Sequence, residues 1–360
     1  MVSNINLITS LSRTGYGIAG LNILLQLERL GVTTHTFSPT GSFQGVYANT
    51  QAEAEIISKS VERAKLFAKD APCVKIWHQF DLAQSCGSPY IGFPIFELDT
   101  FTEQEKHHLS YPDQLFVCSK WAKSVIESQV SGCNIKVVPL GINPEIFRNG
   151  AKEKQPNSPY IFFNCGKWEV RKGHDILVKM FNDAFTPDDD VELWLMPHNP
   201  FLSEHESKEW ENYYKNSKLG DKIRILPEVK THHELAQIMR QTDCGIFPAR
   251  AEGWNLELLE MMALGKQVIT TNYSAHTEFC YDGNAYLVNT PELELAYDGK
   301  WFFNQGNWAK IGKDQVDCFI SFMRCCEDIR PKNSAGITTG QRFTWENSAK
   351  TICEYLGLGK

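Results

Sequence analysis

The chain has 360 residues, of which 42% are hydrophobic and 22% are charged, and its formal net charge at pH 7 is −7. This length is enough for two domains of ordinary size, and this composition is typical of a globular protein rather than a disordered one. The acidic balance disfavours a large nonspecific interface with a nucleic-acid backbone, although it leaves room for a local basic groove.

The N-terminal residues give no sign of export. They contain no basic region, and their apolar run is too short for a signal peptide. No stretch of the chain approaches the roughly 18 apolar residues of a membrane span. The eleven cysteines are odd in number and scattered, and they lack the spacing of zinc ligands. We therefore expect reduced thiols in a cytoplasmic protein.

The first strand is predicted over residues 4–9 by its apolar run, and a glycine-containing turn follows it. Gly15 and Gly17 lie in this turn, before a helix pattern that runs to Leu30. A second strand is predicted over residues 31–37. Strand, helix and strand in this order predict the start of a doubly wound α/β domain. The two glycines either form a tight connection or bring backbone close to a ligand.

Two polar residues follow later apolar segments of the same half. His78 comes directly after a strand predicted over residues 74–77, and Glu97 follows the apolar segment 89–96. Ligands of open parallel sheets bind at the carboxyl ends of the strands, so His78 is a candidate binding residue. A hydrogen-bonded structural histidine is the alternative. Glu97 either contacts an acceptor molecule or serves as a cap or ion-pair partner.

Residues 151–159 have the composition of a linker, because they are polar, contain two prolines and show no periodicity. We therefore predict an N-terminal domain over residues 1–150 and a C-terminal domain over residues 151–340. A last helix is predicted within residues 341–360.

The second domain begins with a strand over residues 160–164, followed by a basic loop. This loop contains Lys167, Arg171 and Lys172, and a helix pattern follows from Asp175. Three cations in a glycine-flanked loop can neutralise the diphosphate of a leaving group. A solvated basic loop is the alternative.

Residues 243–278 read as strand, loop, helix and strand. The loop contains Glu252 and Gly253, and Asn255 is suited to cap the helix. Free backbone N–H groups at a helix start favour an anion such as phosphate. Glu260 comes eight residues after Glu252, so one ligand across the helix start can contact both. Two carboxylates beside a phosphate site suit a nucleotide sugar, which has hydroxyls at both ends and phosphates between them. Solvated glutamates on a helix face are the alternative.

This segment resembles the E-x7-E signature of retaining glycosyltransferases of family 4, which have the two-domain GT-B fold. Asn255 stands where the family usually has Gly, Glu257 where it usually has Pro, and Gln267 where Pro is common. These departures loosen any inference about which sugar is bound. The residues that match are Glu252, Gly253, Leu256, Leu258, Leu259, Glu260, Met262, Ala263, Gly265, Val268 and Glu278.

The resemblance implies an α/β fold with two Rossmann-like domains that face each other across a cleft. It also implies that the last helix, which begins in the Phe-Thr-Trp-Glu element at 343–346, crosses back to the first domain. In the family, the first glutamate contacts the donor sugar and the second holds the ribose. The implied donor-binding residues are Gly15, Gly17, Arg171, Glu228, Val229, Gly253, Trp254, Asn255, Leu256 and Glu260.

The function implied by the resemblance is retaining transfer of a hexosyl unit from a nucleoside-diphosphate sugar to an acceptor hydroxyl, without a metal or another cofactor. The implied catalytic residues are Glu252, Lys172, Lys167 and His78, with Glu97 on the acceptor side. An epimerase or hydrolase of the same fold, a binding protein without turnover and a subunit of a larger transferase are the alternatives. The sugar, the nucleobase, the acceptor and the oligomeric state stay open.

Overall fold

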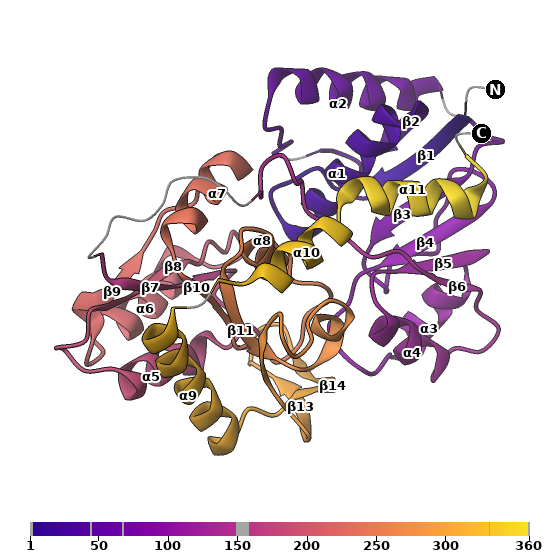
Figure 1. The fold of residues 1–360 in the computed structure, drawn as a ribbon. Helices are drawn as coiled ribbons and strands as arrows, with labels where there is room; N and C mark the ends of the chain where they lie inside the picture. The colour runs from indigo at the N-terminus through magenta and orange to yellow at the C-terminus, as the bar shows by residue number, and fades with distance from the viewer. Residues whose placement is uncertain (1–2, 44, 67, 149–157, 331, 359–360) are drawn as a thin grey trace. The chain divides into compact units, whose positions relative to one another are not determined.

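The computed structural model describes residues 3–43, 45–66, 68–148, 158–330 and 332–358. Its contacts divide the chain into two units, and each unit is a parallel sheet with helices (Figure 1). The first unit comprises Met1–Asn143 and Arg342–Lys360, and the second comprises Pro144–Gln341. The domain boundary expected at residues 150 and 151 lies outside the described residues.

The first unit contains a six-stranded sheet whose strands run parallel in the order β2-β1-β3-β4-β5-β6. The order reverses between β1 and β3, so the loops that follow these two strands meet at a topological switch point. The strands are β1 Ser3–Thr9, β2 Val32–Phe37, β3 Cys73–Trp77, β4 Tyr90–Pro94, β5 Gln114–Val117 and β6 Ile135–Val137. The helices are α1 Gly15–Arg29, α2 Gln51–Arg63, α3 Glu103–Ser110, α4 Lys120–Glu127 and α11 Trp345–Leu356, with a 3-10 turn at Ala64–Leu66.

The C-terminal helix α11 belongs to the first unit, as expected. It packs against α1, and in Figure 1 this yellow helix lies among the indigo and magenta elements. The backbone N–H of Ile142 donates to the carbonyl of Phe343 at 3.0 Å, and Ser348 Oγ donates to the Pro139 carbonyl at 2.6 Å. These bonds attach the start of α11 to the segment that follows β6.

The second unit contains another six-stranded parallel sheet, in the order β12-β11-β10-β7-β8-β9. This is the Rossmann order, and its switch point lies between β7 and β10. The strands are β7 Tyr160–Cys165, β8 Val191–Met196, β9 Ile223–Ile225, β10 Cys244–Phe247, β11 Gln267–Thr271 and β12 Tyr286–Val288. The helices are α5 His174–Ala184, α6 Glu204–Lys215, α7 His232–Gln241, α8 Leu256–Ala263, α9 Lys313–Ile329 and α10 Ser334–Arg342, with 3-10 turns at Gly220–Lys222 and Ser274–Glu278.

The sheet of the second unit is buried on both faces, which explains why its strands are apolar runs rather than alternating patterns. Phe162, Leu193 and Ile246 are fully buried and belong to one core with side chains of α5 and α9. Such a rigid core fixes the carboxyl ends of β7 and β10, from which the candidate site is built.

Local start signals of the sequence are confirmed. Thr231 and Glu234 form the predicted capping box of α7, and the Asn255 side chain caps α8. An antiparallel hairpin, β13 Leu293–Tyr297 and β14 Phe303–Ala309, was not predicted. Among the helices that the structure describes, none has both the length and the apolar character needed to cross a membrane.

Candidate active site

The loops that follow β7 and β10 are joined by a network of buried ion pairs. Glu252 places its two carboxylate oxygens 2.7 Å from Lys172 Nζ and 2.9 Å from Arg171 Nη1. Arg171 Nη2 lies 2.8 Å from Glu169, whose other oxygen lies 2.7 Å from Lys167 Nζ. Only Lys167 is substantially exposed, at 34% of its side chain. Three cations therefore face two carboxylates in this network.

Close backbone packing holds the two loops together. Gly173 has φ of 78°, and a Cβ atom there would lie 2.2 Å from the carbonyl oxygen of Pro248. The backbone N–H of Arg250 donates to the Arg171 carbonyl at 2.7 Å, and its guanidinium binds both Asp175 oxygens at 2.8 Å. A glycine is thus required where the loops meet, and the positions of Lys172 and Glu252 are fixed.

Glu252 and Lys172 are both charged in the free protein. Burial favours the neutral form of Glu252, but Arg171 and then Lys172 outweigh it and lower the pKa of this carboxyl. Burial likewise opposes the charge of Lys172, and Glu252 and Glu257 outweigh it and raise the pKa of the ammonium. Glu252 is therefore a hydrogen-bond acceptor at neutral pH, and Lys172 is a point charge.

Asn255 begins α8 in a conformation that favours glycine. Its φ is 83°, and its Oδ1 accepts from the Leu258 N–H at 3.2 Å. Its Nδ2 donates to His276 Nε2 at 3.0 Å, and His276 Nδ1 donates to the Thr271 carbonyl at 3.1 Å. Burial lowers the pKa of His276 to about 4, so the neutral ring can accept the bond. Asn is the non-glycine residue that best tolerates this backbone.

Glu260 lies on α8 with only 4% of its surface exposed. Burial, and then repulsion by Glu257, raise its pKa well above the ordinary value. The same two carboxyls, after burial, raise the pKa of the Cys165 thiol at the end of β7. The structure therefore brings Glu260 to the strand edge at which Lys172 also lies.

The other residues expected to bind the donor are distributed along the same unit. Glu228 follows β9, and its carboxylate lies 3.5 Å from His198 Nε2 beyond β8. Val229 is half-buried beside it. Gly253, Trp254 and Leu256 are buried in the loop and first turn of α8, and the Trp254 ring centroid lies 4.9 Å from that of Phe279.

Three of the expected residues of the first unit lie at its switch point: Gly15 and Gly17 in the first turn of α1, rather than in a turn before it, and His78 directly after β3. A Cβ atom on Gly17 would lie 2.2 Å from the Ser12 carbonyl oxygen, whereas one on Gly15 would meet nothing within 4 Å. Tyr16, between these glycines, places its hydroxyl 3.2 Å from His78 Nδ1 and donates to the Ile95 carbonyl. The glycine turn and His78 are therefore brought together. Glu97 is half-buried beyond β4.

Sequence reasoning missed three residues that organise these sites: Glu169, His276 and Tyr16. Glu169 stands two residues from both Lys167 and Arg171, which was a usable signal for an ion pair. Tyr16 is the aromatic residue within the glycine turn. Nothing in the local pattern marked His276 as the partner of Asn255.

Among the described residues, no three His, Cys, Asp or Glu side chains are grouped as metal ligands.

The parallel sheets and their connections match those of solved glycosyltransferases. Sucrose-phosphate synthase from Thermosynechococcus elongatus superposes with a TM-score of 0.73 and 17% identity, covering 98% of both chains. HepE from Anabaena, solved in complex with UDP-glucose, gives a TM-score of 0.69 and 13% identity, covering 98% of this chain and 99% of that one. The chain has the GT-B fold.

The sequence comparisons add a family match that lies within the second unit and one curated relative. Residues 159–297 match the model of the family described as "Glycosyl transferases group 1". A glycosyltransferase of Methanocaldococcus jannaschii named as uncharacterised, MJ1178, is 26% identical over an alignment of 225 residues that covers 57% of this chain. The match spans 58% of the length of that relative.

Proposed function

We propose that the GT-B chain is a retaining glycosyltransferase that moves a hexosyl unit from a nucleoside-diphosphate sugar to an acceptor hydroxyl. The observation that carries this proposal is the buried position of Glu252, ion-paired with Lys172 and Arg171 directly before the start of α8. Free N–H groups at the helix start and two cations favour a diphosphate there. HepE, solved with UDP-glucose, supports a donor of this class.

Charge redistribution on donor binding is the core of the proposed mechanism. As the glycosidic bond breaks, negative charge grows on the diphosphate, and Lys172, Lys167 and the amides of residues 253–256 stabilise it. When the donor binds, its phosphate oxygens replace Glu252 as partners of Lys172. The carboxylate released in this way accepts a hydroxyl of the donor sugar. Glu260 accepts the ribose hydroxyls, and the loop with Glu228 and Val229 meets the base.

Retention, metal independence and location are further parts of the proposal. The leaving group departs and the acceptor attacks on the same face of the sugar, with His78 and Glu97 on the acceptor side. Arg171, Lys172 and Lys167 supply the positive charge that a divalent cation supplies in other transferases. A cytoplasmic location fits the eleven free cysteines, since thiols stay reduced there.

Product analysis by NMR tests the proposal. The wild type is incubated with UDP-, GDP- and ADP-hexoses and a set of mono- and disaccharide acceptors, with and without EDTA. We expect a new glycoside with the anomeric configuration of the donor, formed equally well with EDTA. In Glu252→Gln the yield should fall at least a hundredfold while nucleotide binding stays within a few-fold of the wild type.

The matched control is Glu292→Gln, which changes an exposed glutamate that pairs with Lys310 at 2.7 Å and should keep full activity. A new sugar still attached to the nucleotide would identify an epimerase, and free sugar formed despite the acceptors would identify a hydrolase. Unchanged transfer by Glu252→Gln would refute the role given to this residue.

A further inference from the structure

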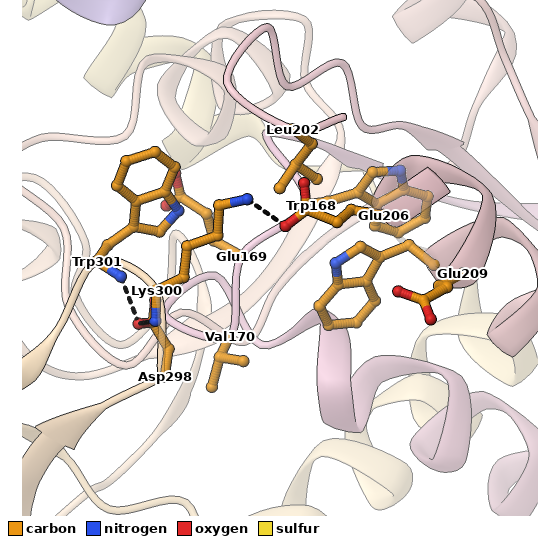
Figure 2. Close-up of a pocket in the computed structure, with 10 residues that line it drawn as sticks. Trp168, Glu169, Val170, Leu202, Glu206, Glu209, Asp298, Lys300 and Trp301 are labelled. Atoms are coloured by element: carbon orange, nitrogen blue, oxygen red, sulfur yellow. Dashed lines mark hydrogen bonds and ion pairs between the residues drawn. The ribbon is translucent and has the colours of Figure 1, made fainter. Parts of the chain in front are cut away.

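A pocket of about 360 Å³ lies in the second unit outside the residues assigned to the donor. It is walled by the loop after β7, by α6 and by the turn of the β13–β14 hairpin, with Trp168, Trp210 and Trp301 among its lining residues (Figure 2). Asp298, Lys300 and Trp301 lie beyond residue 297, where the match to the family model ends. One wall is therefore a feature of this chain that the family match does not cover.

Three of the ten lining residues are tryptophans. The rings of Trp168 and Trp210 are stacked with an interplanar angle of 5° and centroids 5.6 Å apart. Trp301 is 40% exposed, and its ring packs edge-on to Phe201, which is 55% exposed. Trp301 thus presents part of an aromatic face at the pocket, and such a face can pack on an apolar part of a ligand.

The turn that presents Trp301 is built rigidly. Asp298 Oδ1 accepts from the backbone N–H groups of Lys300, Trp301 and Phe302 at 2.7 to 2.9 Å. At the other end of the hairpin, the Ala309 N–H donates to the Arg250 carbonyl at 2.9 Å. Trp301 is therefore held in place before any ligand arrives, which lowers the entropy cost of binding.

The polar groups of the pocket include both a donor and an acceptor. Lys300 Nζ pairs with Glu206, as Figure 2 shows, and lies 5.5 Å from the centroid of the Trp301 ring. The Glu209 carboxylate is 67% exposed and 3.6 Å from His205. The carboxylate of Glu169 is already engaged by Arg171 and Lys167. Lys300 has further N–H donors beside its bond to Glu206, and Glu209 is the more exposed carboxylate, so these two groups can bind a ligand.

These features together select the chemical class of the ligand. An anionic ligand would be repelled by Glu206 and Glu209. A cationic ligand would compete with Lys300 for the carboxylate of Glu206. A pyranose ring suits all of them, because its apolar C–H face packs on indole and its hydroxyls both donate and accept. A volume of about 360 Å³ falls within the range of small-molecule sites.

We propose that this pocket binds a sugar residue of the acceptor glycan, at a distance along the glycan from the reacting hydroxyl. The assignment to the acceptor rests on the proposed function, whereas carbohydrate binding by the pocket stands without it. Trp301 stacks on the pyranose, and Glu209 and Lys300 bind its hydroxyls. The pocket would favour oligosaccharide acceptors over single sugars.

An array of immobilised oligosaccharides tests the proposal directly. Full-length protein carrying a peptide tag is applied to the array and detected through the tag. We expect the wild type to bind at least one structural class of glycan. Trp301→Ala and Glu209→Gln should each weaken that binding at least tenfold. Tyr281→Ala, which removes an aromatic residue that is 53% exposed and outside the pocket, should leave binding unchanged.

A nucleotide thermal-shift measurement on the same variants separates this proposal from the proposed function. Trp301→Ala should keep the wild-type shift with its nucleoside diphosphate, which shows that the fold and the donor site are intact. Absence of glycan binding by the wild type, or equal binding by Trp301→Ala, overturns the pocket assignment. A nucleotide shift in that case leaves the proposed glycosyltransferase function standing.

Discussion

Asn255 shows how a single residue can satisfy a backbone requirement and a side-chain requirement together. At φ of 83° a glycine would be free of strain, but it has no side chain to accept from the Leu258 N–H or to donate to His276. Asn is somewhat strained at this φ, but its side chain forms both hydrogen bonds. The departure from glycine at this position is thus compatible with an intact helix start.

Replacing Asn255 by Ala and by Gly should separate strain from capping. Ala loses the cap and keeps the left-handed φ, so we expect the free energy of unfolding to fall by about 2 kcal/mol. Gly relieves the strain, so the free energy of unfolding should fall less than in the Ala variant, because glycine is nearly as good a cap residue. Urea denaturation of both variants measures the difference. An Ala variant as stable as the Gly variant would contradict the left-handed conformation.

At the scale of elements, the first turns of α1, which contain Gly15, Gly17 and Gly20, are held by contact with the end of β1 and the segment that follows it. The peptide of Ser12 lies against Gly17, and the Thr9 side chain and Ser10 carbonyl lie against Gly20, where a Cβ atom would come within 2.0 Å of Thr9 Oγ1. Gly15 has no such neighbour. Gly17 is therefore needed for packing whether or not it also binds a ligand.

Gly17→Ala and Gly15→Ala form a matched pair that tests this difference. The added methyl group at Gly17 forces the backbone of Ser12 to move, so stability should fall by about 1–3 kcal/mol. At Gly15 stability should be unchanged or rise by up to about 1 kcal/mol, because Ala restricts the unfolded chain. Thermal unfolding of the two variants provides the comparison, and equal effects would show that the turn is packed differently.

Most elements were predictable because each strand and helix has its own local signal. The alternation over Leu293–Tyr297 and the Asp298-Gly299 dipeptide after it also form a hairpin signal, so the β13–β14 hairpin was predictable from the sequence. The ion-pair network around Glu252 could not be predicted from the sequence. Lys172 and Glu252 are 80 residues apart, and only the crossing of the chain at the β7–β10 switch point brings them together.

At the scale of the whole molecule, buried histidines make stability depend on pH. Burial lowers the pKa of His174 to about 4, and that of His276 likewise. His174 Nε2 donates to the Gly166 carbonyl at 3.1 Å, a bond that favours the charged ring, but burial outweighs it and keeps the ring neutral. Because the unfolded chain binds protons first, each histidine stabilises the fold fully above pH 6.5, and this contribution is lost as the pH falls towards 4. Glu260, whose pKa is raised, acts in the opposite direction.

His174→Gln isolates one of these contributions. Between pH 6.5 and pH 4 the stability of the wild type should fall more steeply than that of the variant, by about 3 kcal/mol over the window. The measurement is urea denaturation at several pH values. His205→Gln, which changes a side chain that is 82% exposed, should keep the wild-type slope. Parallel curves for wild type and His174→Gln would contradict a buried neutral histidine.

We propose that the loops after β7 and β10 bind the diphosphate of a nucleotide sugar without a metal. Isothermal titration calorimetry with UDP, GDP and ADP, with and without EDTA, tests it most directly. We expect one nucleotide to bind equally well in EDTA and Lys172→Ala to bind it at least tenfold more weakly, a loss of about 1.4 kcal/mol. Lys179→Ala, which changes a lysine that is 66% exposed, should bind like the wild type. No binding of any of the three nucleotides, or equal binding by Lys172→Ala, would contradict the claim.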